Sequence, residues 1–226
     1  MLSRPKIDTT MQFVRRLVII TGFLGVFTTV AVGCAGAQDT GVGLRRDELP
    51  PAGFGTLKQD DIAISLRTES FSIGVIPLDE SVIRLLAPDT YASMHRLLDS
   101  KIAEIIATGA KYGSRDPVPF LVSFYGREAR ARFDPEALTI TGQNRLFRPV
   151  GILPISPSFG DRQLNQRETA TAVFVYESGI RLADPFTVSY NGISSDQWER
   201  NLRTLERERT AVATRAAAAR RPGAHP

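Results

Sequence analysis

The chain has 226 residues with 28 basic and 24 acidic side chains, and its formal net charge is +4. Four of the basic residues lie before the cleavage zone of an export signal, so the rest of the chain is nearly neutral and lacks the basic surface expected of a nucleic-acid-binding protein. The single cysteine, Cys34, excludes both a disulfide framework and a thiolate metal site.

Residues 1–37 have the organisation of an export signal. Arg15 and Arg16 form a charged region, residues 17–33 form an apolar run, and Ala35-Gly36-Ala37 supplies small residues for cleavage. This order of charged, apolar and small residues is typical of secretory signals. We therefore expect the mature protein to lie outside the cytoplasm.

The segment Ala31-Val32-Gly33-Cys34 resembles the lipobox of bacterial lipoproteins, in which a small residue precedes a cysteine that becomes the acylated N-terminus. The resemblance covers this signal only, and Ala31 stands where leucine is usual. It implies that acylated Cys34 anchors the protein to a lipid bilayer, since each buried methylene contributes about 0.8 kcal/mol. Two alternatives remain: cleavage after Ala37 would give a secreted protein, and an uncleaved run would span the membrane.

After the signal, the sequence predicts a tether and one domain. Residues 38–55 contain several glycines and Pro50-Pro51, a composition typical of a flexible linker. Residues 56–214 are enough for a single domain with a sizeable core and too few for two.

The domain is expected to begin with a hairpin and two helices. Apolar residues alternate over 62–66 and 71–76, which predicts two half-buried strands. Asp79 is a suitable N-cap for a short helix, and Pro88 suits the first turn of a longer helix that ends at Gly109. The apolar stripe of the longer helix consists of Tyr91, Met94, Leu98, Ile102, Ile105 and Ile106.

Residues 117–190 predict a series of short antiparallel strands. Apolar residues recur with a period of two, and turn residues such as Gln143-Asn144 separate the runs. Segments 131–138, 147–149 and 186–190 are similar to immunoglobulin-like accessory modules of bacterial envelope proteins, although the Cys and Trp landmarks of antibody domains are missing. We therefore expect an α+β fold: an antiparallel immunoglobulin-like β-sandwich with a helical insertion after the opening hairpin and a C-terminal helix.

The C-terminal helix has a predicted start and a predicted end. Ser194 and Gln197 have the spacing of a capping box, and Ile193 is placed to contact Trp198 as a hydrophobic staple. The apolar stripe comprises Trp198, Leu202, Leu205 and Val212. Its first two turns are expected to dock on the domain, with the rest projecting and residues 215–226 forming a disordered basic tail.

The domain lacks familiar catalytic motifs. There is no H-E-x-x-H, C-x-x-C or G-x-S-x-G. His95 is expected to be an ordinary helix residue, and the pairs Asp60-Asp61 and Asp79-Glu80 are expected to be solvated or to cap helices. The sequence therefore predicts no enzyme, no metal and no cofactor.

A bias toward arginine within the proposed sandwich suggests a partner surface. Arginine suits bidentate recognition of acidic groups, but the acids interleaved with these arginines favour edge protection and ordinary ion pairs. Phe159 could form a partner-binding edge or close a loop over the core. The candidate surface consists of Arg127, Arg130, Arg132, Arg145, Arg148 and Phe159.

These observations favour a non-enzymatic lipoprotein of the bacterial cell envelope that acts as an interaction or structural module. Its expected partners are the lipid bilayer, through Cys34, and an unidentified envelope protein, but not nucleic acid. The competing hypothesis is a secreted or anchored accessory protein that binds a ligand or acts as a hydrolase through the arginine-rich surface.

Overall fold

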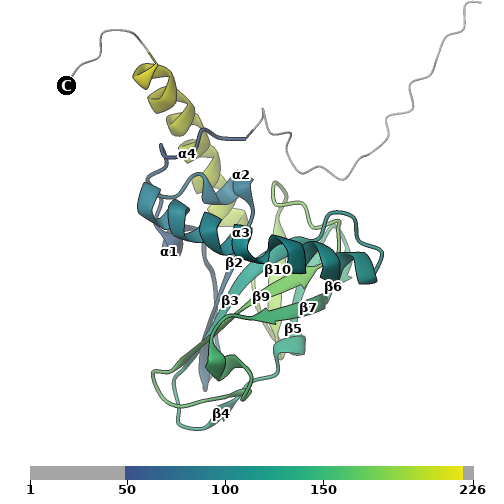
Figure 1. Ribbon diagram of the computed structural model, residues 1–226. Coiled ribbons are helices and arrows are strands. Elements are labelled where there is room, and N and C mark those ends of the chain that lie inside the picture. The colour runs from purple at the N-terminus through teal and green to yellow at the C-terminus, as the bar shows by residue number, and fades with distance from the viewer. Residues whose placement is uncertain (1–48, 221–226) are drawn as a thin grey trace, which may run out of the picture. The chain divides into compact units, whose positions relative to one another are not determined.

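The computed structural model describes residues 49–220 (Figure 1). The predictions for the export signal, for Cys34 and for residues 38–48 and 221–226 lie outside the described residues.

The described chain alternates helices and short strands. Its first half contains α1 (Gln59–Ile62), β1 (Ile64–Arg67), β2 (Phe71–Pro77), α2 (Glu80–Ile83), α3 (Pro88–Lys111) and β3 (Val118–Gly126). The middle contains β4 (Ala131–Arg132), the 3-10 helix η1 (Pro135–Ala137), β5 (Leu138–Gly142), β6 (Arg145–Phe147), β7 (Pro149–Pro154) and the 3-10 helix η2 (Pro157–Phe159). The last part contains β8 (Gln163–Leu164), β9 (Thr169–Tyr176), β10 (Phe186–Tyr190), β11 (Ile193–Ser195) and α4 (Gln197–Ala219).

The strands form three antiparallel sheets. Five strands pair in the order β1-β2-β3-β9-β7, four pair in the order β11-β10-β5-β6, and β4 pairs with β8. The expected opening hairpin is β1 and β2, and the expected turn at Gln143-Asn144 joins β5 to β6 with both residues at positive φ. The predicted α+β class, with antiparallel sheets and a C-terminal helix, is confirmed.

Aromatic side chains from both larger sheets meet in one core. Phe124 of β3 stacks on Phe133 with ring centroids 4.5 Å apart and meets Tyr190 of β10 edge-on at 5.7 Å. Phe120 and Val122 are fully buried on the same face of β3. The period-two pattern of this strand therefore identified the residues that face the second sheet.

Helix α3 covers part of the other face of the five-stranded sheet (Figure 1). Gly151 of β7 lies so close to α3 that an added Cβ would be 2.2 Å from Thr108 Cγ2. Two residues of the predicted stripe, Ile102 and Ile106, are 43% and 52% exposed. The predicted apolar stripe of α3 was therefore too wide, because only some of its residues pack against the sheet.

Two helix boundaries differ from the predictions. Helix α3 ends at Lys111, not at Gly109, and Gly113 takes the left-handed conformation that follows the helix, at φ +72°. Gly109 instead allows close contact with Pro117, since an added Cβ would lie 2.8 Å from its side chain. The first predicted strand, over 62–66, begins later than expected, because Ile62 ends the helical turn α1 and β1 starts at Ile64.

Helix α4 begins and ends differently from the prediction. Ser194 is in β11, the N-cap is Asp196, and the Gln197 Oε1 atom accepts a hydrogen bond from Ser65 N, so the capping box does not form. The helix continues to Ala219, and Ala216 is only 2% exposed. The expected boundary between residues 214 and 215 therefore falls inside a packed helix.

The last residues of the expected tether belong to the domain. Pro50 is buried, and Leu57 forms an isolated parallel bridge with Leu86. Gly55 lies against the backbone of Leu85, where an added Cβ would be 2.3 Å from the carbonyl carbon. The domain therefore starts before the expected boundary at residue 56.

Candidate functional site

The candidate arginines form two separate groups. Arg127 follows the end of β3 and donates to Thr68 O at 2.7 Å. Arg145 pairs with Glu177 at 2.7 Å, and Glu177 follows the residue of β9 that pairs with the start of β3. Strand β3 has nine residues, so at about 3.3 Å per residue the two groups are about 30 Å apart.

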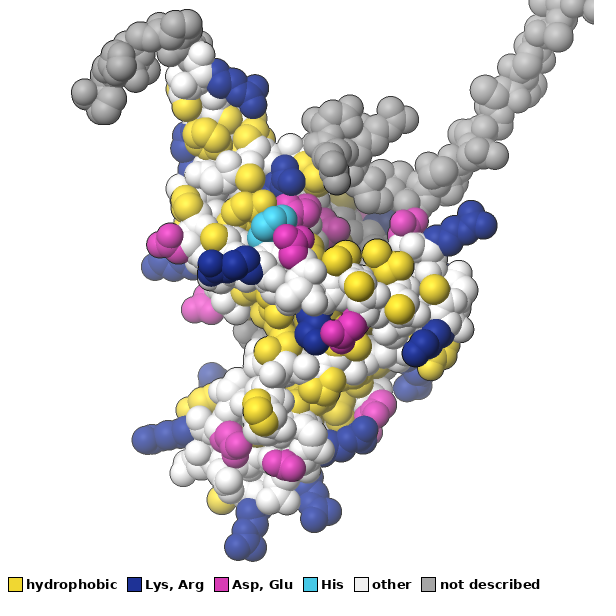
Figure 2. All heavy atoms as spheres, in the orientation of Figure 1, with side chains coloured by type: hydrophobic (Ala, Val, Ile, Leu, Met, Phe, Trp, Pro, Cys, Tyr) yellow, Lys and Arg dark blue, Asp and Glu magenta, His cyan; other side chains and the backbone are white. Residues whose placement is uncertain are grey.

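The remaining arginines do not join these groups into one surface. Arg130 and Arg132 are exposed near β4, whereas Arg148 is exposed between β6 and β7. Figure 2 shows dark blue side chains scattered over the visible face, with no single patch of them. The described structure therefore does not bring the candidate arginines together into one surface, and a partner role for either group stays a prediction.

Phe159 belongs to the core and is not a partner-binding edge. Its side chain is 4% exposed, and it meets Phe133 and Phe174 edge-on at centroid distances of 5.3 and 6.1 Å. The 3-10 helix η2 turns the side chain inward. Of the two interpretations of Phe159, closure of a loop over the core is correct.

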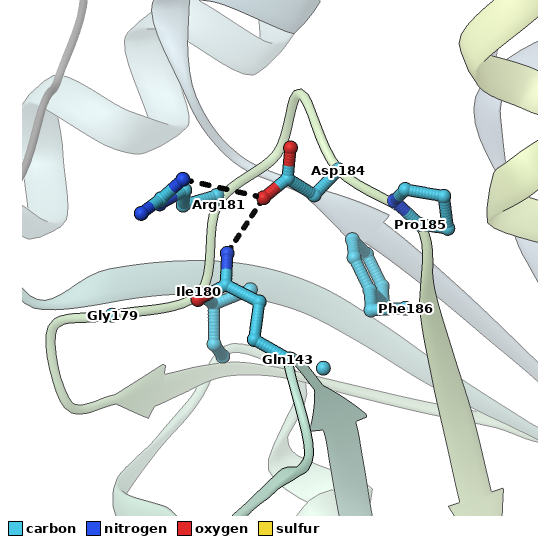
Figure 3. A pocket seen from close by; sticks show the side chains of 8 residues that line it. Gln143, Gly179, Ile180, Arg181, Asp184, Pro185 and Phe186 are labelled. Atoms are coloured by element: carbon cyan, nitrogen blue, oxygen red, sulfur yellow. Dashed lines mark hydrogen bonds and ion pairs between the residues drawn. The ribbon is translucent and has the colours of Figure 1, made fainter.

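A crevice at the start of β10 is too small to be a ligand site (Figure 3). Asp184 accepts a hydrogen bond from Gln143 Nε2 at 2.6 Å and faces Arg181 at 3.7 Å. The crevice has a volume of about 10 Å³. This is about the space that one water molecule requires.

A larger groove runs beside β7, the edge strand of the five-stranded sheet. Its volume is about 430 Å³. Both apolar side chains and polar groups line it, including one charged pair. The lining includes Pro135, Glu136, Val150, Ile152, Phe159 and Arg162.

The charged pair in the groove is neutral as a whole. Arg162 Nη2 donates to Glu136 Oε1 at 2.8 Å, and both side chains are more than half exposed. A hydrogen bond between the carboxyl groups of Asp134 and Glu136 raises the pKa of Asp134 and lowers the pKa of Glu136. Asp134 therefore holds a proton more readily, while Glu136 stays ionised beside Arg162.

Prolines shape this groove. Pro135 and Pro157 each begin a 3-10 helix, and Pro149 and Pro154 bound β7. Proline cannot donate a backbone hydrogen bond, so it is tolerated on an edge strand. The sequence signal for this site is the proline-rich stretch from 147 to 160. Glu136 and Arg162 carry no local signal, because only the fold brings them together.

His95 joins two helices. Its Nδ1 atom is 2.6 Å from Glu80 Oε1, and its ring stacks on Tyr91 with centroids 5.3 Å apart. Burial and the neighbouring Glu80 carboxylate raise the pKa of Tyr91. Glu80 therefore links α2 to α3, while Asp79 caps α2 as predicted by accepting from Ser81 N.

Within residues 49–220, no helix is both long and apolar enough to cross a membrane. No three metal-ligating side chains in this part of the chain are arranged to hold a metal ion. Comparison of the chain with protein-family models, with curated proteins and with solved structures finds no match in any of the three.

Proposed function

We propose that this protein is a non-enzymatic, membrane-anchored lipoprotein of the bacterial envelope whose domain is an interaction module. The observation that carries the proposal is the groove beside β7, with its volume of about 430 Å³. A groove that combines apolar side chains with a few polar groups has the usual character of a binding site. The Arg162–Glu136 pair is internally neutral, which suits a partner without net charge at this point.

We also propose that the two larger sheets form an immunoglobulin-like sandwich. The chain passes from one sheet to the other between β6 and β7 and again between β9 and β10. Phe120 of one sheet meets Phe186 of the other edge-on at 6.0 Å. Shared inward-facing residues and repeated crossings between sheets support this arrangement.

The anchor in this proposal is Cys34. The described residues begin at Leu49, fifteen positions after Cys34, and the chain enters the domain through Pro50 and Thr56. Arg84 Nη1 donates to Pro50 O at 3.4 Å, and Thr56 N donates to Glu208 Oε1 at 2.8 Å. These contacts hold the start of the domain against the end of α2 and against α4. Such contacts suit a domain that is anchored to the membrane at its N-terminal end.

The anchor is tested by mass spectrometry of the mature N-terminus, together with membrane fractionation. We expect an acylated N-terminal Cys34, and we expect Cys34→Ser to move the protein out of the membrane fraction or to block its processing. A mature chain that begins at Gln38 would instead establish the secreted alternative. An uncleaved chain would establish a membrane-spanning segment.

The interaction module is tested by placing a photo-crosslinking residue in the groove in intact envelopes. Pro154 lines the groove and is exposed, and Tyr125 on β3 is an exposed control at 41%. We expect a defined crosslinked species from position 154 that is missing from position 125. Equal crosslinking at both positions, or none at position 154, would contradict a partner in the groove.

A further inference from the structure

The unpaired edge of β7 directs backbone hydrogen-bonding groups toward the groove. On the paired edge, Ile155 N donates to Thr171 O of β9 at 2.9 Å. Successive residues of a strand direct their backbone groups to opposite edges, so Leu153 also points toward β9. The Ile152 N–H and C=O and the Pro154 C=O therefore point away from β9.

The register of β9 leads to the same assignment. Gly126 N of β3 donates to Glu168 O at 2.8 Å, so the backbone groups of Glu168 point toward β3. Every second residue after it does the same, and Thr171 points toward β7. Neither backbone group of Ile152 has a hydrogen bond to another described residue outside the β7–β9 pairing.

We propose that a short extended segment of a partner protein adds to β7 as a further strand. This inference rests on the proposed function and identifies how the groove binds its partner. Another extended backbone is the ligand whose donors and acceptors match a strand edge, and such addition is a recurring mode of peptide recognition.

The prolines restrict the length of this pairing. Pro154 offers an acceptor but no donor, and the pairing of β7 is irregular between Pro149 and Gly151. Added hydrogen bonds are therefore centred on Ile152 and extend over only a few residues. The same prolines hinder a second copy of the chain from pairing along the whole edge.

The side chains of the groove determine the composition of the segment. Residues of the segment on the same face as Ile152 point into the groove and meet the half-buried Val150 and Ile152, so they are apolar. Residues between them point to the opposite face of the sheet, on the side of Gly151 and Leu153, and are polar. The partner segment therefore alternates apolar and polar residues.

The probe for this proposal is an acetylated and amidated seven-residue peptide that alternates threonine and valine. In antiparallel pairing, the residue opposite Ile152 has its side chain on the same face as Ile152 and its N–H toward β7. The valine N–H groups would therefore bond to β7 while the threonine N–H groups point outward. A peptide with N-methylated valines and one with N-methylated threonines form a matched pair.

Binding to the full chain in detergent micelles is measured with fluorescently labelled peptides. We expect the peptide with N-methylated threonines to bind like the parent and the peptide with N-methylated valines to bind roughly tenfold or more weakly, because hydrogen bonds are lost. Equal binding of the two methylated peptides, or no binding of the parent peptide, would overturn strand addition.

A pair of protein variants tests the same hydrogen bond from the other side. Ile152→Pro removes an outward N–H and leaves the bonds to β9, whereas Ile152→Val keeps the N–H and the shape. We expect both variants to stay folded and only the proline variant to lose peptide binding. Should the proline variant unfold, the methylated peptides alone decide. A crosslink at position 154 without peptide binding would reject strand addition but still support the interaction module. Absence of both the crosslink and peptide binding would reject both proposals.

Discussion

At the scale of single residues, the buried Glu208 carboxylate joins the start of the described chain to its end. It is 9% exposed, and its Oε1 atom accepts from Thr56 N, Thr56 Oγ1 and Arg215 Nη2 at 2.8, 2.9 and 2.6 Å. These three donors come from opposite ends of the described chain. The ionised Glu208 carboxylate is stable in this buried position only while these donors remain to pair with it.

Glu208→Ala is expected to lower the free energy of unfolding by about 2 to 3 kcal/mol, because it leaves the Thr56 N–H without an acceptor. Urea unfolding of the purified chain measures the change. Glu206→Ala is the matched control on the same helix, because its side chain is 71% exposed and pairs only with Arg209. Equal effects of the two substitutions would show that the contact to Thr56 contributes little.

Tyr176 links stability to alkaline pH. Burial raises the pKa of its hydroxyl well above the usual value of 10.0, and the hydroxyl donates to Leu138 O at 3.2 Å. Because the folded state keeps this proton, its contribution is complete below pH 10 and is lost as the pH rises further. Burial also raises the pKa of Tyr190, which adds to the same trend.

We expect the free energy of unfolding to fall as the pH rises above 10. In Tyr176→Phe the slope of this fall should be smaller by about 1.4 kcal/mol per pH unit. Urea unfolding between pH 8 and pH 11 provides the comparison. At pH 8 the variant loses only one hydrogen bond, worth about 1 kcal/mol. Parallel pH profiles for the two proteins would contradict the assignment.

At the scale of elements, the length of α4 corrects an expectation drawn from the sequence. Its second half was expected to project, because the apolar stripe narrows and arginines and alanines follow. In the fold, however, Val212 and Ala216 are buried and Arg215 pairs with Glu208. The helix is thus part of the packing as far as Ala216.

Truncation after Thr214 is expected to destabilise the domain by about 1 to 3 kcal/mol, since it removes the cation beside the buried Glu208 carboxylate. Truncation after Arg220 keeps Arg215 and Ala216 and should leave the thermal midpoint unchanged. Thermal unfolding of the two truncated proteins separates these outcomes. Equal midpoints would restore the sequence-based boundary between residues 214 and 215.

At the scale of the whole described domain, the two larger sheets share one core. The ring of Phe124 contacts Phe71 of β2, Phe174 of β9 and Tyr190 of β10, with centroids 6.2, 6.5 and 5.7 Å apart. A core shared in this way couples the sheets, so neither is expected to unfold alone.

Phe124→Ala should therefore lower the free energy of unfolding by about 3 to 5 kcal/mol and preserve a single transition. Tyr125→Ala changes the next residue of β3, which points to the opposite face and is 41% exposed, so it should cost far less. Fluorescence and circular dichroism recorded through the same urea titration test for one transition. Two separate transitions would mean that the sheets have independent cores.

The sequence by itself determined the features that depend on local order. The period of two over residues 117–190 predicted the strands, because alternate side chains of a strand share a face. Gln143 and Asn144, at φ 52° and 59°, formed the predicted turn because residues of this type suit tight hairpins. The N-cap at Asp79 was equally local, since its acceptor lies two residues from its donor.

Only the tertiary structure decided which residues from distant parts of the chain meet. Glu208 reaches Thr56 across 152 positions, which explains why neither the start of the domain nor the end of α4 could be placed from composition. The burial of Phe159, the separation of Arg127 from Arg145 and the groove opposite Ile152 depend equally on how the sheets pair. A local pattern predicts which face of an element is apolar, whereas the partner of that face is set by the packing of the whole chain.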